Sequence, residues 1–270
     1  GVTALSEDGK SVMDAALYEK AMEIAAKLDL PVFAHCEDKD KVNGGVMNAG
    51  KKAEELSLPG ITNEVEDIIA KRDIELSEKT GARLHLCHCS TKESPEYIRE
   101  AKERNLKVTG EVCPHHFAMS EEEIATDDGN YKMNPPLRGV EDVEALKQGL
   151  VDGSFDVIST DHAPHGWEEK NQSMLKAPFG IVGLETAFCL SVTHLVETGL
   201  LTRSQLVEKM SRNPAKVLGV EKGSLQPGMA ADIAIADFEA EWVIDREAFF
   251  SKGKNTPFHG KTVKGRIEMT

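Results

Sequence analysis

The sequence lacks the long apolar runs, basic stripes and paired cysteines on which several classes of protein depend. No stretch approaches the ~18 consecutive apolar residues of a membrane-spanning helix, and no basic, apolar leader marks the chain for secretion. The 32 Lys and Arg residues are mixed among 46 Asp and Glu residues, for a formal net charge of -14. Because no basic face is present, nucleic acid is excluded as an expected partner, and so is a membrane.

Cysteine usage points to a reducing environment. The five cysteines are odd in number and form no CxxC motif. A chain of 270 residues, 40% of them hydrophobic, can bury a sizeable core without disulfide bonds. We therefore predict a cytoplasmic protein with reduced thiols. Cys87 and Cys89 alternate along an apolar run, which favours buried thiols over metal ligands.

Short apolar runs alternate with segments of helical period over the first 222 residues. A helix is expected from about Ser11 to Leu28, with its apolar face formed by Met13, Leu17, Ala21, Ile24 and Leu28. A second helix is expected to contain Val65, Ile68, Ile69 and Leu76. A third is expected behind the strand ARLHLCHCS, with Ser90 and Thr91 as its caps. Repeated βα units with near-continuous apolar strands predict a parallel sheet, either doubly wound or closed as a barrel.

The pattern changes at about Gly223. The segment GSLQPGMAADIAIADFEAEWVID is typical of turn, strand and turn, because Ala231, Ile233 and Ile235 alternate with smaller or polar residues. No helical period accompanies this alternation. We therefore predict two units, a partial βα barrel carrying the catalytic site over residues 1–222 and part of a small β-sandwich over residues 223–270.

Metal-competent side chains stand at the ends of four predicted strands. Asp8 is the last residue of VTALSED, and Asp161 follows the run FDVIST. His35 ends the apolar face of the strand in PVFAHCED, and His88 does the same in ARLHLCHCS. Taken singly, each residue has a structural interpretation as a turn, a helix cap or a buried polar group. Parallel strands bring their carboxyl ends to one edge, where βα barrels build active sites, so the joint pattern favours a metal centre.

Strand alternation assigns a side to each histidine of the third of these runs. His88 is predicted to share one face with Leu84 and Leu86, because strand side chains point alternately to opposite faces. His85 then lies on the opposite face, and we interpret it as structural.

Two histidines and two carboxylates suit zinc or another borderline divalent ion. Such an ion lowers the pKa of a bound water molecule from ~15.7 towards ~7. A carboxylate at the same site can take the proton and pass it to a leaving nitrogen, and Asp161 is the candidate for this step.

Longer motifs resemble those of dihydroorotases, which belong to the amidohydrolase superfamily. In chain order they are FAHCED, LHLCHCST, TGEVCPHH, KMNPPLR, STDHAPH, APFGIVGLET, NPAKVLGV and GMAADI. Hydantoinases and allantoinases are similar in the PHH and PPLR regions, whereas DHAPH followed by APFGIVGLET favours dihydroorotase. The resemblance implies an α/β fold, a (β/α)8 TIM-like barrel with a small β-sandwich, of which about five of the eight barrel strands are present.

The resemblance also implies roles for individual residues. One metal ion is bound by His35 and His88, while Asp161 binds another and acts as acid and base; Asp8 stands at the bridging position. This implies two Zn²⁺ ions in an intact site. Substrate contacts fall on Asn134, on His165 beside the substrate carboxylate, and on the backbone of Phe179 and Gly180. The same resemblance assigns no metal role to His115 or His116.

One family motif has no counterpart in the sequence. An HxH motif, usually followed by a substrate-binding arginine, ends the first barrel strand in this family, and no HxH precedes Asp8. By strand ends, Asp8 to Asp161 then correspond to the fourth to eighth strands. We therefore expect an internal fragment that lacks three strands and is inactive alone.

The expected activity is reversible hydrolysis of dihydroorotate to N-carbamoyl-aspartate in pyrimidine biosynthesis. One alternative is an allantoinase or hydantoinase with the same chemistry on another ring. The other is a catalytically silent dihydroorotase-like subunit that binds aspartate transcarbamoylase. Beyond the small-molecule substrate, the expected partners are a second copy of the chain or that transcarbamoylase.

Overall fold

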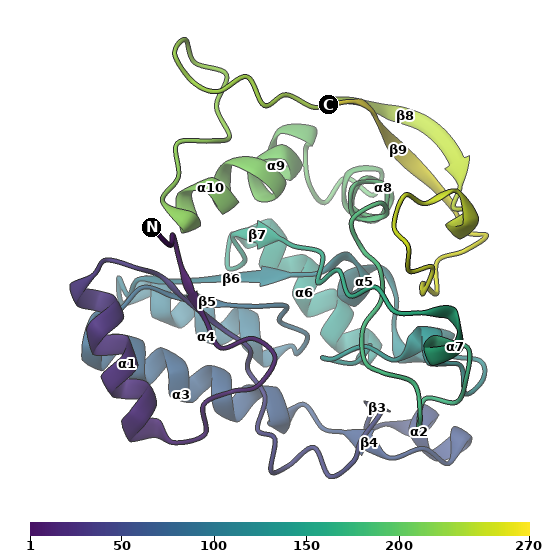
Figure 1. Ribbon diagram of the computed structural model, residues 1–270, viewed down its shortest axis with the longest axis horizontal. Helices are drawn as coiled ribbons and strands as arrows, with labels where there is room; N and C mark the ends of the chain where they lie inside the picture. The colour runs from purple at the N-terminus through teal and green to yellow at the C-terminus, as the bar shows by residue number, and fades with distance from the viewer.

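A computed structural model describes residues 1–270, and a five-stranded parallel sheet lies at its centre (Figure 1). The sheet has the strand order β1-β2-β5-β6-β7, with all neighbours parallel. Its strands are β1 (Leu5–Ser6), β2 (Val32–Ala34), β5 (Leu84–Leu86), β6 (Val108–Val112) and β7 (Val157–Ile158). The alternation of strands with helices confirms the predicted TIM-barrel-like α/β fold.

Helices connect the strands and follow the last of them along the chain. They are α1 (Ala15–Lys27), α2 (Lys51–Leu56), α3 (Glu64–Thr80), α4 (Glu93–Glu103), α5 (Pro114–Ala118), α6 (Val140–Asp152), α7 (Trp167–Lys170), α8 (Ala187–Ser191), α9 (Arg203–Val207) and α10 (Asn213–Leu218). Short 3-10 turns are η1 (Glu121–Glu123), η2 (Gly129–Tyr131) and η5 (Arg246–Ala248), and π-helical turns η3 (Val192–Val196) and η4 (Glu208–Arg212) extend α8 and α9. No helix is both long and apolar enough to cross a membrane.

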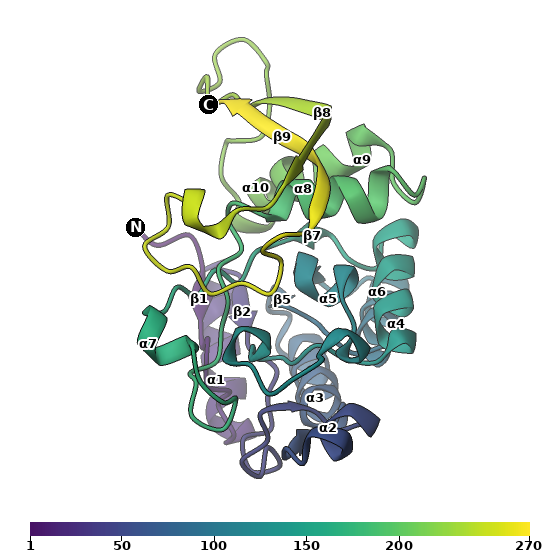
Figure 2. The same cartoon turned by 90° about the vertical axis from the view of Figure 1, so that its right-hand side faces the viewer.

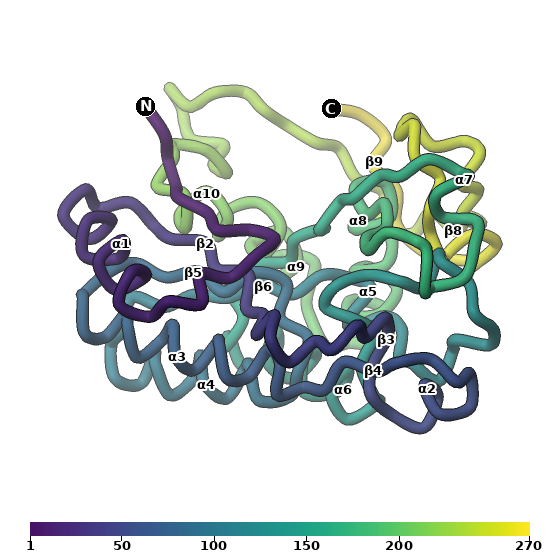
Figure 3. The backbone as a smooth tube through the Cα atoms, turned by 60° about the horizontal axis from the view of Figure 1, so that its bottom comes forward, coloured from purple at the N-terminus to yellow at the C-terminus, as the bar shows by residue number.

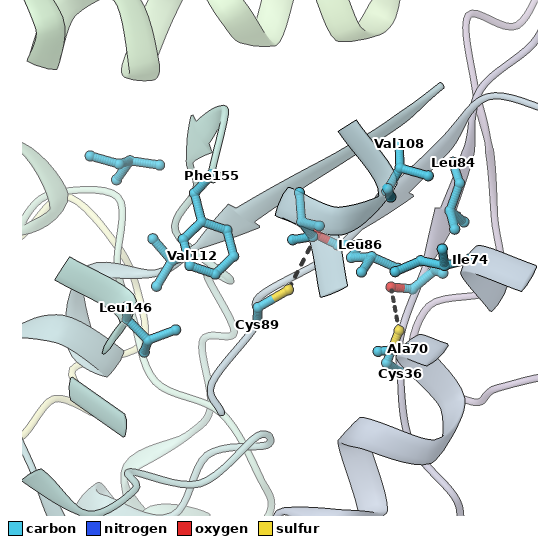
Figure 4. Close-up of a cluster of buried hydrophobic side chains, with 14 of the residues drawn as sticks. Cys36, Ala70, Ile74, Leu84, Leu86, Cys89, Val108, Val112, Leu146 and Phe155 are labelled. Atoms are coloured by element: carbon cyan, nitrogen blue, oxygen red, sulfur yellow. Dashed lines mark hydrogen bonds between the residues drawn. The ribbon is translucent and has the colours of Figure 1, made fainter. Parts of the chain in front are cut away.

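The principal core lies between the sheet and its helices. Leu84 and Leu86 of β5 lie there beside Ile74 of α3, and Val112 of β6 lies beside Leu146 of α6 (Figure 4). All five cysteines are buried free thiols, as predicted for Cys87 and Cys89. The thiol of Cys89 also lies 3.8 Å from the carbonyl oxygen of Leu86.

Helix α1 differs from its prediction in both its start and its face. Asp14 accepts hydrogen bonds from the backbone N–H groups of Ala16 (3.0 Å) and Leu17 (3.1 Å), so the helix begins at Ala15. Its buried residues are Tyr18, Met22 and Ala25, whereas Leu17, Ile24 and Leu28 are exposed. The segment thus contains two sets of apolar residues at helical spacing. The set that faces α3 and the sheet is the buried one.

Ser90 and Thr91 do not cap α4, which begins at Glu93 without a side-chain cap. Both residues instead serve the buried carboxylate of Glu66 on α3. Glu66 accepts from the backbone N–H of Ser90 at 2.9 Å and from its hydroxyl. Burying a carboxylate without such donors is costly. Hydrogen bonding to Glu66 therefore stabilises the fold more than capping the first turn of α4 would.

The C-terminal segment forms a two-stranded antiparallel ribbon of β8 (Ile235–Val243) and β9 (Thr262–Met269). The strand predicted from Ala231 begins only at Ile235. The ribbon packs on α8, while residues 246–260 return towards the loops at the carboxyl ends of the sheet (Figure 2). A second short parallel pair, β3 (Met47–Asn48) and β4 (Gly60–Ile61), lies in the β2–α3 connection near α2 (Figure 3).

Candidate metal centre and substrate pocket

His88 reaches the site through a backbone reversal. Register pairs Phe33 with His85 and Ala34 with Leu86, so His85 shares the inner face with Phe33, their rings 4.6 Å apart. Regular alternation would place His88 on the outer face with Leu86. The strand ends at Leu86, however, and His88 has a φ of 35°, a conformation rare for non-glycine residues. His88 therefore lies beside His35, as its predicted role requires, but the argument from strand alternation that shares its face with Leu84 and Leu86 is wrong.

A buried carboxylate supports this reversal. Glu111 of β6 accepts a hydrogen bond from the backbone N–H of His88 (3.2 Å) and lies 3.1 Å from Nε2 of His85. The other ring nitrogen of His85 lies 2.8 Å from the hydroxyl of Thr109. This agrees with the structural role predicted for His85.

His35 is positioned by the connection that precedes α1. The buried hydroxyl of Ser11 donates to the backbone carbonyl of His35 and accepts from the N–H of Glu37 at 2.9 Å. Ser11 therefore fixes the turn after β2. Glu37 in turn accepts from the amide of Asn134 and lies 3.8 Å from Nε2 of His35.

Asp8, His35 and His88 form a compact triangle of ligand atoms. Nδ1 of His35 lies 3.0 Å from Nε2 of His88, and Oδ1 of Asp8 lies 3.3 Å from the first nitrogen and 3.6 Å from the second. Four-coordinate zinc with ligands at ~2.0–2.1 Å separates them by about 3.3 Å. The three atoms therefore fit one shared ion with only small shifts.

The electrostatics of the triangle favour positive charge at its centre. Burial lowers the pKa of His35, but the carboxylates of Asp8 and Glu37 more than compensate and bring the pKa to about 9. Hydrogen bonds from His35 and His88 hold the pKa of Asp8 well below its usual range. A divalent cation can supply this charge while both imidazoles stay neutral. Neutral imidazole is the form that binds metal.

The other predicted residues converge on the same place. A hollow of about 230 Å³ is lined by Asp8, Gly9, His35, His88, Asn134, Asp161, Ala163, Phe179 and Gly180. Seven of the eight predicted site residues thus line one pocket. Asp161 also has a positive φ, 46°, and burial raises the pKa of its carboxyl. It stands outside the compact triangle.

His165, the eighth predicted residue, lies directly behind the pocket wall. Its Nε2 is 2.8 Å from the backbone carbonyl of Phe179, and its backbone N–H donates to Oδ1 of Asn255 (3.0 Å). His165 therefore contacts the loop to which the resemblance assigns substrate contacts.

Sequence reasoning missed residues that support the site. Glu37 joins His35 to Asn134, and its only sequence signal is an acidic residue two positions after the histidine. Asn255 carries no signal that predicts its place beside Gly180. Cys113, His115 and His116 form a second, fully buried group of possible ligand atoms that does not line the pocket.

Comparison with known proteins agrees with this geometry. Residues 3–270 match the model of the Amidohydrolase family. The chain belongs to the amidohydrolase family. The family is metal-dependent, and the triangle of Asp8, His35 and His88 is a group of residues that could hold an ion.

Several curated amidohydrolases resemble the chain along its whole length. A dihydroorotase from Staphylococcus epidermidis is 49% identical over 270 residues, and one from Anoxybacillus flavithermus is 48% identical over 270 residues. The chain covers 64% and 63% of these two proteins, respectively. It therefore spans a little under two thirds of the length of these relatives.

Solved amidohydrolase structures share the fold. An L-hydantoinase (dihydropyrimidinase) from Arthrobacter aurescens superposes with a TM-score of 0.85 at 27% identity, covering 99% of this chain and 61% of that protein. A D-hydantoinase (dihydropyrimidinase) from a Thermus species gives 0.83 at 26% identity, covering 97% and 60%.

Proposed function

We propose that the protein is a dihydroorotase, which reversibly hydrolyses dihydroorotate to N-carbamoyl-aspartate. The observation that carries this proposal is the identity of 49% to a protein of that activity across the whole chain. The pocket adds support, because residues drawn from motifs 172 positions apart, Asp8 to Gly180, line one hollow. We also propose the division into a barrel unit, residues 1–222, and a β unit, residues 223–270.

The metal centre fits the reaction. We assign two Zn²⁺ ions to the intact site: His35 and His88 would hold one, Asp161 would hold the other, and Asp8 would be a further ligand. When bound, zinc supplies Lewis acidity, which polarises the ring carbonyl and makes water more acidic. His35 and His88 contribute neutral nitrogens, and Asp8 contributes negative charge.

A side chain of the protein transfers the proton that hydrolysis requires. Hydrolysis joins the water oxygen to the ring carbonyl carbon and breaks the bond from that carbon to the ring nitrogen. One proton must leave the water and one must reach the nitrogen. We assign this transfer to a carboxylate oxygen of Asp161, which lines the pocket. Asn134, His165 and the backbone of Phe179 and Gly180 orient the substrate.

A substrate panel tests this proposal against its nearest alternative. Hydantoinases share the fold at 24–27% identity, so a hydantoin or dihydropyrimidine is the rival substrate. The full-length gene product is expected to hydrolyse dihydroorotate with the highest kcat/KM among dihydroorotate, hydantoin, dihydrouracil and allantoin. A higher value for hydantoin or dihydrouracil would overturn the assignment, and no turnover of any ring despite full zinc content would favour a silent subunit.

His165→Ala is expected to weaken substrate binding and leave the metals in place. The imidazole lies on the Phe179 loop and outside the triangle of ligand atoms. Loss of one oriented contact should raise KM for dihydroorotate by roughly tenfold. Steady-state kinetics and zinc content by atomic emission would be measured together. If zinc is lost and KM is unchanged, His165 is a ligand and our division of roles is wrong.

A further inference from the structure

The loop Pro178–Gly180 has an unusual set of backbone partners. Each of its three consecutive carbonyl groups contacts a different side chain. The carbonyl oxygen of Pro178 accepts from Nζ of Lys170 (2.9 Å), that of Phe179 lies 2.8 Å from Nε2 of His165, and that of Gly180 accepts from Nδ2 of Asn255 (3.0 Å). The loop's acceptors are therefore all engaged by the protein.

The backbone N–H groups of this loop, unlike its carbonyl groups, are not all bonded within the protein. The N–H of Gly180 donates to the carbonyl oxygen of Lys132 (3.0 Å), and Pro178 has no N–H. The N–H of Phe179 has no partner within the chain. Because Phe179 and Gly180 line the pocket, this N–H is the one backbone group of the loop free to bind a ligand.

Asn255 is the residue that joins this loop to the one after β7. Its side chain is 3% exposed, and its amide donates to the carbonyl oxygens of both Ala163 (2.9 Å) and Gly180 (3.0 Å). Its Oδ1 accepts from the N–H of His165 (3.0 Å). Its own carbonyl accepts from the N–H of Val182 (2.9 Å). This amide therefore links two pocket loops, which the backbone hydrogen bond from Ala163 N–H to the carbonyl oxygen of Ile181 (2.9 Å) also joins.

The loop that contains Gly180 packs closely against the loop that contains Ala163. Gly180 has a φ of 117°, and a Cβ built there would lie 2.4 Å from Cβ of Ala163. The two loops thus touch at the point where Asn255 bonds to both. We expect loss of the Asn255 contacts to shift one loop relative to the other.

Lys170 holds the other side of the loop. Its side chain is buried, 1% exposed, and Nζ donates to the carbonyl oxygens of Pro178 and Lys132, both at 2.9 Å. The carbonyl oxygen of Lys132 also accepts a hydrogen bond from the N–H of Gly180. A buried ammonium group requires such acceptors, so Lys170 ties the loop to the segment that leads to Asn134.

We propose that Asn255 is a positioning residue that sets substrate affinity, by fixing the Phe179–Gly180 backbone so that the Phe179 N–H binds a ring carbonyl of the substrate. Lys170 supports the same loop from its opposite side. This inference rests on the proposed function only for the choice of ring. A cyclic ureide carries carbonyl acceptors at fixed angles, and a donor on a rigid loop selects for them.

The test compares Asn255→Ala with Thr256→Val in the full-length gene product. Thr256 is the buried neighbour of Asn255, and its hydroxyl accepts one bond from the N–H of Phe258 (3.2 Å), away from the pocket. Asn255→Ala is expected to raise KM by roughly tenfold to hundredfold, because small misplacements of binding groups are costly. Its kcat is expected to change less than about threefold, with unchanged zinc content. Thr256→Val should leave KM unchanged.

Asn255→Asp separates the two halves of the amide. It keeps the acceptor for His165 but loses the donors to Ala163 and Gly180, so its KM should resemble that of Asn255→Ala. A wild-type KM in Asn255→Asp and Asn255→Ala, with only a lower melting temperature, would overturn the proposal in favour of a purely structural role.

A second readout keeps this inference separate from the proposed function. If the wild-type protein acts on another cyclic amide in the panel, the same KM comparison is made with that substrate. Hydrogen exchange of the peptide covering residues 177–183 is measured in every case. Asn255→Ala should accelerate exchange there relative to Thr256→Val, and equal exchange in both variants would refute the positioning role even if no substrate were turned over.

Discussion

Asp161→Asn in the full-length gene product is expected to lower kcat for dihydroorotate by about 10²–10⁴-fold, the loss typical of a general acid and base. The amide has nearly the same shape as the carboxylate, but it cannot accept and return a proton at neutral pH. It is also a weaker metal ligand. If zinc is lost as well, the decrease should be larger.

The measurement pairs turnover with zinc content. Asp156→Asn is a matched control. Asp156 immediately precedes β7, the strand that Asp161 follows, and it forms an ion pair with Lys102 (2.8 Å) without lining the pocket. The control should keep kcat within a few-fold of wild type. Near wild-type turnover with full zinc in Asp161→Asn would contradict both roles assigned to Asp161.

Arg138→Met is expected to lower the free energy of unfolding by about 3–5 kcal/mol, the cost of breaking a buried charge pair. Arg138 is 2% exposed, and it donates to the carbonyl oxygen of Ile61 (2.8 Å), Oδ1 of Asn48 (3.1 Å) and the hydroxyl of Ser90 (3.1 Å). Its guanidinium lies 4.0 Å from the buried carboxylate of Glu66. Methionine fills much of the volume but removes all three donated hydrogen bonds.

Urea denaturation checks this expectation, with Arg99→Met as the control. Arg99 makes a closer ion pair, 2.7 Å to Asp152, but its side chain is 39% exposed and solvent screens the pair. The control should therefore cost less than about 1 kcal/mol. The double variant Glu66→Gln/Arg138→Met should cost less than the sum of its single changes, because the two sites interact. Equal losses for Arg99→Met and Arg138→Met would show that burial does not decide the effect.

Periodicity predicted much of the architecture but not which surfaces meet. Alternating strand and helix patterns predicted the parallel sheet and the helix α3. The apolar spacing of Leu17, Ile24 and Leu28 predicted the wrong buried face for α1. A period describes one element alone, whereas the buried face depends on where α3 and the sheet lie.

The candidate site shows the same division. Metal-competent residues at strand ends were recognisable because parallel strands share one edge, and Asp8, His35 and His88 do converge there. The side on which His88 lies could not be predicted, because it depends on a left-handed residue held by the carboxylate of Glu111, 23 positions away. The alternation of side chains holds only within the regular strand, which ends at Leu86, two residues before His88.

By itself, the sequence determined the fold class and the family and supplied the candidate site residues, because local periods and short motifs record these features. Only the tertiary structure decided how those residues are held. Asn255 lies 75 positions from Gly180, and Arg138 lies 77 positions from Ile61. No local pattern marks such partners, since each bond exists only because folding brings a buried donor to an acceptor that water can no longer reach.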